Sequence, residues 1–155
     1  FRVRFRPHPE NIKRSQLYLN RIKNQFFGNQ FIFDDDPENL RSMEKAKCLI
    51  TDASGIAIEY VLMFKRPVLY LDDIDKVHNN KFMDFKDITT IDQTIKKTFG
   101  YSFKKNQINE IDSILSKATS EFRDKVIEID SFLDINFYNI GETKKKLNEN
   151  IEFFL

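Results

Sequence analysis

A run of small and polar residues, Thr51-Asp52-Ala53-Ser54-Gly55, has the composition of an anion-binding turn. It follows the apolar run Cys48-Leu49-Ile50 and precedes an apolar segment that begins at Ile56. Where a strand leads through a tight turn into a helix, the first backbone N–H groups of the helix lack partners and lie at its positive end. Small side chains would let a phosphate approach this backbone, and Ser54 could add a hydroxyl donor. Thr51, Asp52, Ser54 and Gly55 are therefore candidate binding residues.

Glu59 is the single charged residue between Ile56 and Phe64, a segment whose apolar character predicts a buried helix. A buried carboxylate needs a hydrogen-bond donor, because burial without one is costly, and ribose hydroxyls would serve. The alternative is that Ser54 only caps the helix while Glu59 faces solvent or pairs with a nearby lysine. The pattern alone leaves both interpretations open.

His8 stands between Pro7 and Pro9, just after an expected strand. The flanking prolines fix the direction of the imidazole, which suits proton transfer or phosphate binding. Arg6, at the end of the same strand, could clamp a phosphate with its guanidinium. The alternative for His8 is an ordinary exposed loop histidine.

The other polar groups point less clearly to a site. His78 is a weaker cleft candidate, and Asp34-Asp35-Asp36 predicts a solvated, helix-capping turn rather than a cation site. Asp52 could also cap its own turn with its side chain. Two histidines and one cysteine give no zinc spacing, so we expect no metal and no cofactor. Cys48, the single cysteine, is expected to be a buried strand residue, which fits a reducing compartment.

Strands and helices are expected to alternate along the first half of the chain. Apolar residues alternate with arginines over residues 1–6, and short apolar runs follow at 31–33, 48–51 and 68–71. Helices are expected between them, at 15–27, at 37–46 with Asp36 as its N-cap, and at 56–64. This order predicts an α/β fold: a Rossmann-like parallel sheet of at least four strands with helices on both faces.

The second half is expected to be mainly helical, with helices at 90–99, 106–119, 120–133 and 142–155. We therefore expect one domain over residues 1–155, with an α/β core at 1–87 and helices at 88–155. The net charge of +1 gives no general attraction to nucleic acid, and no stretch approaches the ~20 apolar residues of a membrane span. No signal peptide is visible. The chain begins with Phe1 inside an expected strand, so we expect a fragment whose N-terminal part is absent.

Two motifs together resemble the CDP-glycerol glycerophosphotransferases, the teichoic-acid-type polymerases and their capsule relatives. They are Arg6-Pro7-His8-Pro9 after a strand, and Leu49-Ile50-Thr51-Asp52-Ala53-Ser54-Gly55-Ile56-Ala57-Ile58-Glu59-Tyr60, which is similar to the family's "ITDYSS" turn and following acidic residue. Residues 65–70 are similar to the family's basic-Pro segment and apolar strand, and 75–76 and 82–85 match more faintly. The resemblance covers about residues 4–85. It departs at Ala53, at Gly55 and at 79–81, where the family has tyrosine, serine and an Arg-Gly pair.

This resemblance implies the C-terminal, donor-binding lobe of a GT-B fold, whose N-terminal lobe is missing, and extra C-terminal helices. It implies that Ser54 and Gly55 hold the donor pyrophosphate, that Glu59 binds ribose hydroxyls, and that His8 acts near the transferred phosphate. The implied activity transfers glycerol phosphate from a CDP-linked donor to a polymer or lipid-linked acceptor, and the chain alone should be inactive. The implied location is cytoplasmic, with peripheral association at the inner face of the membrane, to which Lys144-Lys145-Lys146 could contribute.

Two other functions remain open. The small turn with Glu59 also resembles the UDP-N-acetylglucosamine 2-epimerases, which carry a "TDSGG" turn, so an epimerase or glycosyltransferase using a UDP-sugar is an alternative. A non-enzymatic α/β interaction domain is another. A receiver-like module is disfavoured, because Asp52 and Lys65 do not supply its arrangement of acidic residues and lysine.

Overall fold

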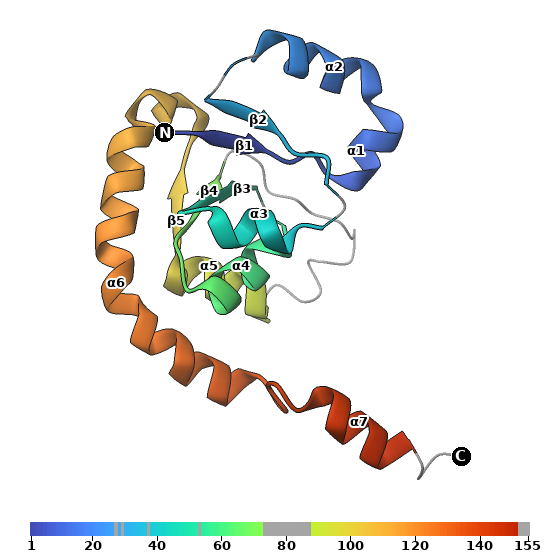
Figure 1. The fold of residues 1–155 in the computed structure, drawn as a ribbon. Helices are drawn as coiled ribbons and strands as arrows, with labels where there is room; N and C mark the ends of the chain where they lie inside the picture. The colour runs from blue at the N-terminus through green and yellow to red at the C-terminus, as the bar shows by residue number, and fades with distance from the viewer. Residues whose placement is uncertain (27, 29, 37, 53, 73–87, 152–155) are drawn as a thin grey trace. The chain divides into compact units, whose positions relative to one another are not determined.

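The computed structural model describes residues 1–155 apart from 27, 29, 37, 53, 73–87 and 152–155 (Figure 1). Ala53 and His78 lie outside the described residues, as do the fainter family matches at 75–76 and 82–85. The chain divides into two compact units, Phe1–Ala46 and Lys47–Leu155, and each is described here by itself. No helix among the described residues combines the length and the apolar character needed to cross a bilayer.

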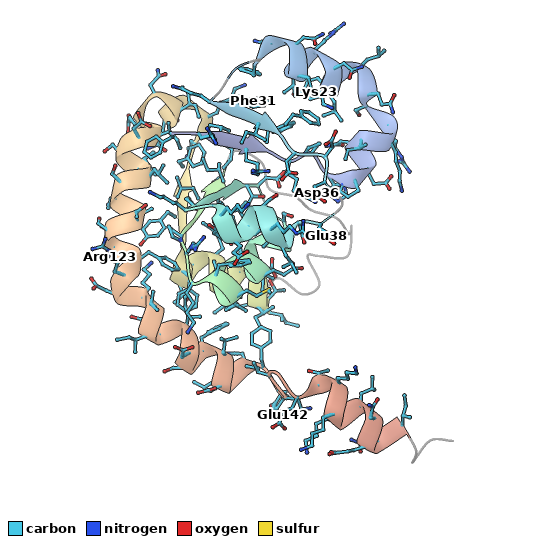
Figure 2. The ribbon with its side chains drawn as sticks, in the orientation of Figure 1. Lys23, Phe31, Asp36, Glu38, Arg123 and Glu142 are labelled. Atoms are coloured by element: carbon cyan, nitrogen blue, oxygen red, sulfur yellow. The ribbon has the colours of Figure 1, made fainter. Side chains whose placement is uncertain are left out.

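The first unit is a βαβ unit with a third helix. Its elements are β1 (Val3–Phe5), α1 (Pro9–Arg14), α2 (Gln16–Gln25), β2 (Phe31–Phe33) and α3 (Leu40–Lys45). β1 and β2 pair in parallel, with Val3 opposite Phe31 and Phe5 opposite Phe33. Aromatic rings close the space between the strands and α2: the ring of Phe31 (Figure 2) lies 6.1 Å from that of Phe5 and 5.3 Å from that of Phe26.

Two helix predictions in this unit need correction. The helix expected at 15–27 is preceded by a separate helix, α1, because His8 and Pro9 start a helical turn that breaks at Ser15. The helix expected from residue 37 begins only at Leu40, and its N-cap is Asn39 rather than Asp36. The side chain of Asp36 instead accepts a hydrogen bond from the Glu38 N–H at 2.9 Å, which holds the chain in a turn ahead of the helix.

The second unit has a three-stranded parallel sheet in the order β3-β4-β5. Its elements are β3 (Leu49–Thr51), α4 (Ile56–Phe64), β4 (Val68–Leu71), α5 (Ile91–Phe99), β5 (Gly100–Phe103), the 3-10 helix η2 (Lys105–Glu110), α6 (Ile111–Asn136) and α7 (Thr143–Ile151). Leu69 and Phe103 pack with Ala118 of α6 on one face. Tyr70, which alternates with Leu69, lies on the other face, with Lys96 of α5 over its ring at 5.5 Å.

The prediction of an α/β fold with parallel strands and flanking helices is therefore confirmed, and the arrangement is compatible with a Rossmann-like fold. All four predicted strands are present. The expected single sheet of four or more strands is wrong for the described residues, because β1 pairs with β2 in one unit while β3 pairs with β4 in the other.

Two features of the second unit differ from the helices expected there. β5 was not predicted, because it is short and starts at Gly100, which appeared only to end a helix. Residues 111–136 form one continuous helix instead of two. Ser120, the expected boundary, lies inside that helix, where its hydroxyl donates to the Lys117 carbonyl at 2.9 Å and so does not end it.

We expect Gly100→Ala to destabilise the second unit by about 1–3 kcal/mol, the usual range for overpacking. A methyl group at this position would lie 2.5 Å from the Lys96 carbonyl oxygen and 2.5 Å from Cε2 of Tyr70, so α5 or the Tyr70 ring would have to move. Denaturant unfolding monitored by circular dichroism would measure the change. Gly55→Ala is the matched control, since a methyl group there meets no atom within 4 Å in the part of the chain that the structure describes. Equal stability of the two variants would contradict the close packing around Gly100.

Candidate functional site

The start of α4 is open in the way an anion-binding helix terminus requires. The chain leaves β3 at Thr51, Gly55 is the N-cap with φ −57° and ψ −26°, and among the described residues no side chain caps it. The carbonyls of Ser54 and Gly55 accept from the Ala57 and Ile58 N–H groups at 3.1 and 3.0 Å, so the hydrogen-bonded turns begin at Ser54. The alternative in which the Ser54 side chain caps α4 is therefore wrong, and its hydroxyl is not committed to that cap.

Space above Gly55 is also available. A Cβ atom built on Gly55 would meet no atom of the described residues within 4 Å, and the residue is exposed. Its helical φ is one that any residue adopts, so the fold itself does not require glycine there. The turn lies at the carboxyl end of a strand in a parallel sheet, which is where open α/β folds bind ligands. These features together would admit a phosphate group to the first N–H groups of α4.

Glu59 is exposed, so the interpretation in which it faces solvent is confirmed and the one in which it is buried is wrong. The buried side of α4 is formed by its neighbours Ala57, Tyr60, Val61 and Leu62. The need for a ribose hydroxyl as the partner of a buried carboxylate is therefore removed. An exposed carboxylate can still accept hydrogen bonds from a ligand, but its charge in the first turn competes with an anion for the positive end of the helix. Asp52 is likewise exposed, and Thr51 is half-buried opposite Tyr70.

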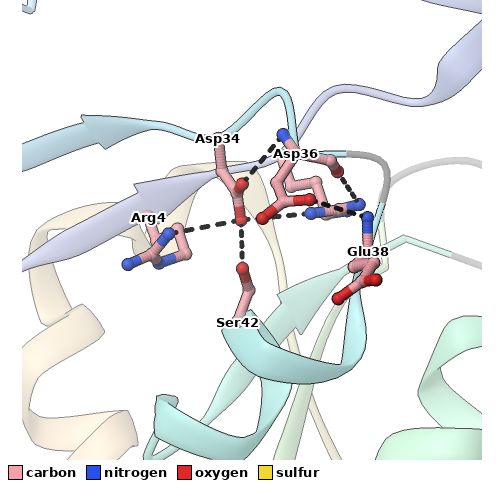
Figure 3. Close-up of polar contacts among 6 residues, drawn as sticks. Arg4, Asp34, Asp36, Glu38 and Ser42 are labelled. Carbon is pink, nitrogen blue, oxygen red and sulfur yellow. Dashed lines mark hydrogen bonds and ion pairs between the residues drawn. The ribbon is translucent and has the colours of Figure 1, made fainter.

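A second polar cluster lies at the carboxyl ends of β1 and β2 (Figure 3). At its centre is Asp34, whose side chain is almost fully buried and whose residue exposure is 4%. Its carboxylate accepts from the Ser42 hydroxyl at 2.5 Å and from the Asp36 N–H at 3.3 Å. The guanidinium groups of Arg6 and Arg4 lie 3.2 and 3.4 Å from Oδ2.

The electrostatics of this cluster favour the charged form of Asp34. Burial acts to raise the pKa of this carboxyl, but the hydrogen bonds from Ser42 and from the Asp36 N–H, together with the positive charge of Arg6, outweigh it. The net effect is a pKa below 3.8. Asp34 is therefore an ionised anchor that joins the ends of both strands to α3.

The polar run Asp34-Asp35-Asp36 predicted only a solvated turn, so the buried role of Asp34 was missed. The pairing of the strands could have revealed it. Parallel strands end at the same edge of a sheet, so Arg6 after β1 and Asp34 after β2 must lie close together. The Asp34 N–H also donates to the Phe5 carbonyl at 2.8 Å, which extends the ladder to this point.

Arg6 is held by this cluster. One of its terminal nitrogens, Nη2, donates to the Asp36 carbonyl. The other, Nη1, is buried and has no hydrogen-bond partner among the described residues, although it lies beside the Asp34 carboxylate. Arg6, the predicted phosphate clamp, is thus already engaged by the Asp34 carboxylate and the Asp36 carbonyl. Any phosphate that it binds must share the guanidinium with Asp34.

His8 is exposed and caps α1, since its Nδ1 accepts a hydrogen bond from the Glu10 N–H at 3.2 Å. A neutral imidazole that accepts at Nδ1 carries its proton on Nε2, so His8 presents an N–H donor outward. Its direction is fixed by the cap as well as by the flanking prolines. Arg6 and His8 belong to the first compact unit, and Thr51, Ser54, Gly55 and Glu59 belong to the second.

The described residues contain no group of three or more His, Cys, Asp or Glu side chains placed to hold a metal ion. Cys48 is half-buried, and burial raises the pKa of its thiol to about 12. The thiol is therefore protonated at neutral pH and is a poor nucleophile. Comparisons with protein-family models, with curated proteins and with solved structures find no match for this chain.

Proposed function

We propose that this chain holds the nucleotide-linked donor of a GT-B-type transferase, of the kind represented by the CDP-glycerol glycerophosphotransferases. The observation that carries the proposal is the open start of α4 after β3, with free space above Gly55 and no side-chain cap among the described residues. The sequence of this element and the Arg6-Pro7-His8-Pro9 motif provide the resemblance on which the choice of family rests.

In the proposed reaction, an acceptor hydroxyl attacks the β-phosphorus of CDP-glycerol, the bond from that phosphorus to the CMP oxygen breaks, and the proton of the attacking hydroxyl passes to solvent. The N–H groups at the start of α4 and the Ser54 hydroxyl stabilise the negative charge that develops on the departing CMP. Glu59 accepts hydrogen bonds from ribose hydroxyls. The acceptor is a cell-surface polymer or its lipid-linked precursor, and the second lobe of the enzyme presents it.

The tautomer of His8 narrows its proposed role. With Nδ1 engaged by the Glu10 N–H, the outward nitrogen is a donor. His8 in this state therefore binds a phosphate oxygen of the transferred group or donates a proton, and it does not abstract one at that atom. Arg6 supports the same phosphate, sharing its charge with Asp34.

A UDP-sugar epimerase or glycosyltransferase is the second candidate. The observation that favours it is Gly55, which stands where the glycerophosphotransferases have serine and the epimerase turn has glycine. Both candidates use the same helix start, so they differ in the donor rather than in the site.

An NMR titration of this chain with CDP-glycerol, CDP, UDP-N-acetylglucosamine and inorganic phosphate tests the proposal. We expect CDP compounds to shift the amide signals of residues 54–59, and Ser54→Ala to weaken binding by about tenfold, the usual effect of losing one hydrogen bond to a charged group. Tighter binding of the UDP-sugar would select the second candidate. Unchanged signals with every nucleotide would reject a donor site in this part of the protein.

A further inference from the structure

The outer face of α6 exposes two large apolar side chains in an acidic setting. Ile127 is 78% exposed and Ile135 is 75% exposed. Their spacing of two helical turns places them on one side of the helix, opposite the buried Phe122 and Ile129. Asp124, Glu128 and Asp134, all exposed, flank them. The α6 outer face is defined here by these five exposed residues.

Helix α7 has the opposite charge. Every one of its residues is exposed, and Leu147 and Ile151, at 57% and 47% exposure, lie one turn apart on the same side. Lys144, Lys145 and Lys146 form a basic run at the start of this helix, and Glu149 is its single acidic residue. The α7 face is defined here as Lys144, Leu147 and Ile151, which share one side of the helix, while Lys145 and Lys146 add positive charge around it.

Leu147 and Ile151, one turn apart, fit between Ile127 and Ile135, which lie two turns apart, and the two helices are opposite in charge. We propose that the α6 outer face of one copy of this chain binds the α7 face of a second copy. Leu147 and Ile151 would lie between Ile127 and Ile135, and Lys144 would lie against the carboxylates of Asp124, Glu128 and Asp134. An anionic lipid surface fits less well, because it would attract α7 but be repelled by the three carboxylates of α6.

Two-fold symmetry would use both faces of each copy. Helix α7 of the first copy would bind α6 of the second, and α7 of the second copy would bind α6 of the first. In each chain the segment between α6 and α7 includes Asn139 at φ 56° and Gly141 at φ 77°. After this segment, α7 is exposed along its whole length, so its own chain does not cover it. Each contact buries only a few apolar side chains, so the dimer belongs to the weak class of interfaces and should weaken as salt rises.

Two variants test this proposal, one with the acidic charges of α6 reversed and one with the basic charges of α7 reversed. The first variant carries Asp124→Lys, Glu128→Lys and Asp134→Lys, and the second carries Lys144→Glu, Lys145→Glu and Lys146→Glu. All six residues are exposed, so folding should be preserved, which circular dichroism would check. We expect the unaltered chain to dimerise with rising concentration in sedimentation equilibrium. Each variant alone should dimerise at least about tenfold more weakly, because like charges then meet.

An equimolar mixture of the two variants should recover the dimer, since every contact in the mixed pair again joins opposite charges. The control for net charge is Lys13→Glu with Lys45→Glu and Lys117→Glu, which makes the same change at exposed lysines outside the two faces. It should associate with the first variant more weakly than the second variant does, because only one of the two contacts then joins opposite charges. The proposal is overturned if the unaltered chain stays monomeric at all concentrations, if mixing restores nothing, or if the control associates equally well. If the monomer bound anionic vesicles and the variant with Lys144→Glu, Lys145→Glu and Lys146→Glu did not, α7 would be assigned to a lipid surface instead.

Discussion

Gly55→Glu should abolish donor binding while leaving the second unit folded. The glutamate side chain would start in the open space at Gly55, where a Cβ atom meets none of the described atoms within 4 Å. A negative side chain near a helix N-terminus is favourable for the helix, so stability should not fall. The same carboxylate would occupy the position proposed for the donor pyrophosphate and repel it. We expect the affinity for CDP-glycerol to fall at least about 100-fold, measured by isothermal titration calorimetry.

Asn109→Glu is the matched control, because it adds the same charge at an exposed residue of η2 in the same unit. It should leave donor affinity unchanged within about twofold. Gly55→Ala adds a smaller group and should reduce affinity by an intermediate amount. If Gly55→Glu bound the donor as tightly as the unaltered chain, the start of α4 would not be the phosphate site, however well the chain bound nucleotides elsewhere.

Asp34→Ala should destabilise the first unit by about 3 kcal/mol, the size expected when one partner of a buried charge cluster is removed. The substitution leaves Arg6, whose Nη1 is already buried without a hydrogen bond, next to an empty site, and it removes the acceptor of the Ser42 hydroxyl. Hydrogen exchange monitored by mass spectrometry, read on peptides from residues 1–46, would locate the loss in this unit.

Asp35→Ala is the control at the adjacent position. The Asp35 side chain is 65% exposed and pairs with Lys23 on the surface, so its removal should change stability by less than about 1 kcal/mol. Equal effects of the two substitutions would show that Asp34 does not anchor the cluster.

Lowering the pH should reproduce part of the loss of stability that Asp34→Ala causes in the first unit. The folded pKa of Asp34 is below 3.8, so the stability that its charge contributes is fully present above that value. This contribution is lost as the pH falls below 3.8 and through the lower, folded pKa. Exchange protection of residues 1–46 in the unaltered chain should therefore decline more steeply below this pH than in Asp34→Asn, which has no proton to gain. Parallel declines would contradict a lowered pKa.

Local sequence patterns determined most of the secondary structure. Alternating Phe and Arg residues predicted β1, short apolar runs predicted β2, β3 and β4, and helical spacing predicted α2, α4 and α5. Such patterns succeed because each depends on residues close in sequence, whose period sets which face is apolar. The strand-turn-helix at residues 49–64 was likewise visible, since an apolar strand, a small-residue turn and an apolar helix are all local features.

The tertiary structure alone decided which groups become buried or partnered. Glu59 lies in an apolar segment yet is exposed, because the direction in which α4 faces depends on what it packs against. Asp34 lies in a polar run yet is buried, because its partners come from two other places in the chain, Arg4 and Arg6 from β1 and its end and Ser42 from α3. The division of the strands into two sheets has the same origin, since strand pairing is set by contacts between distant segments. Sequence spacing fixes local period, whereas burial and charge pairing follow from long-range packing that no single stretch of sequence contains.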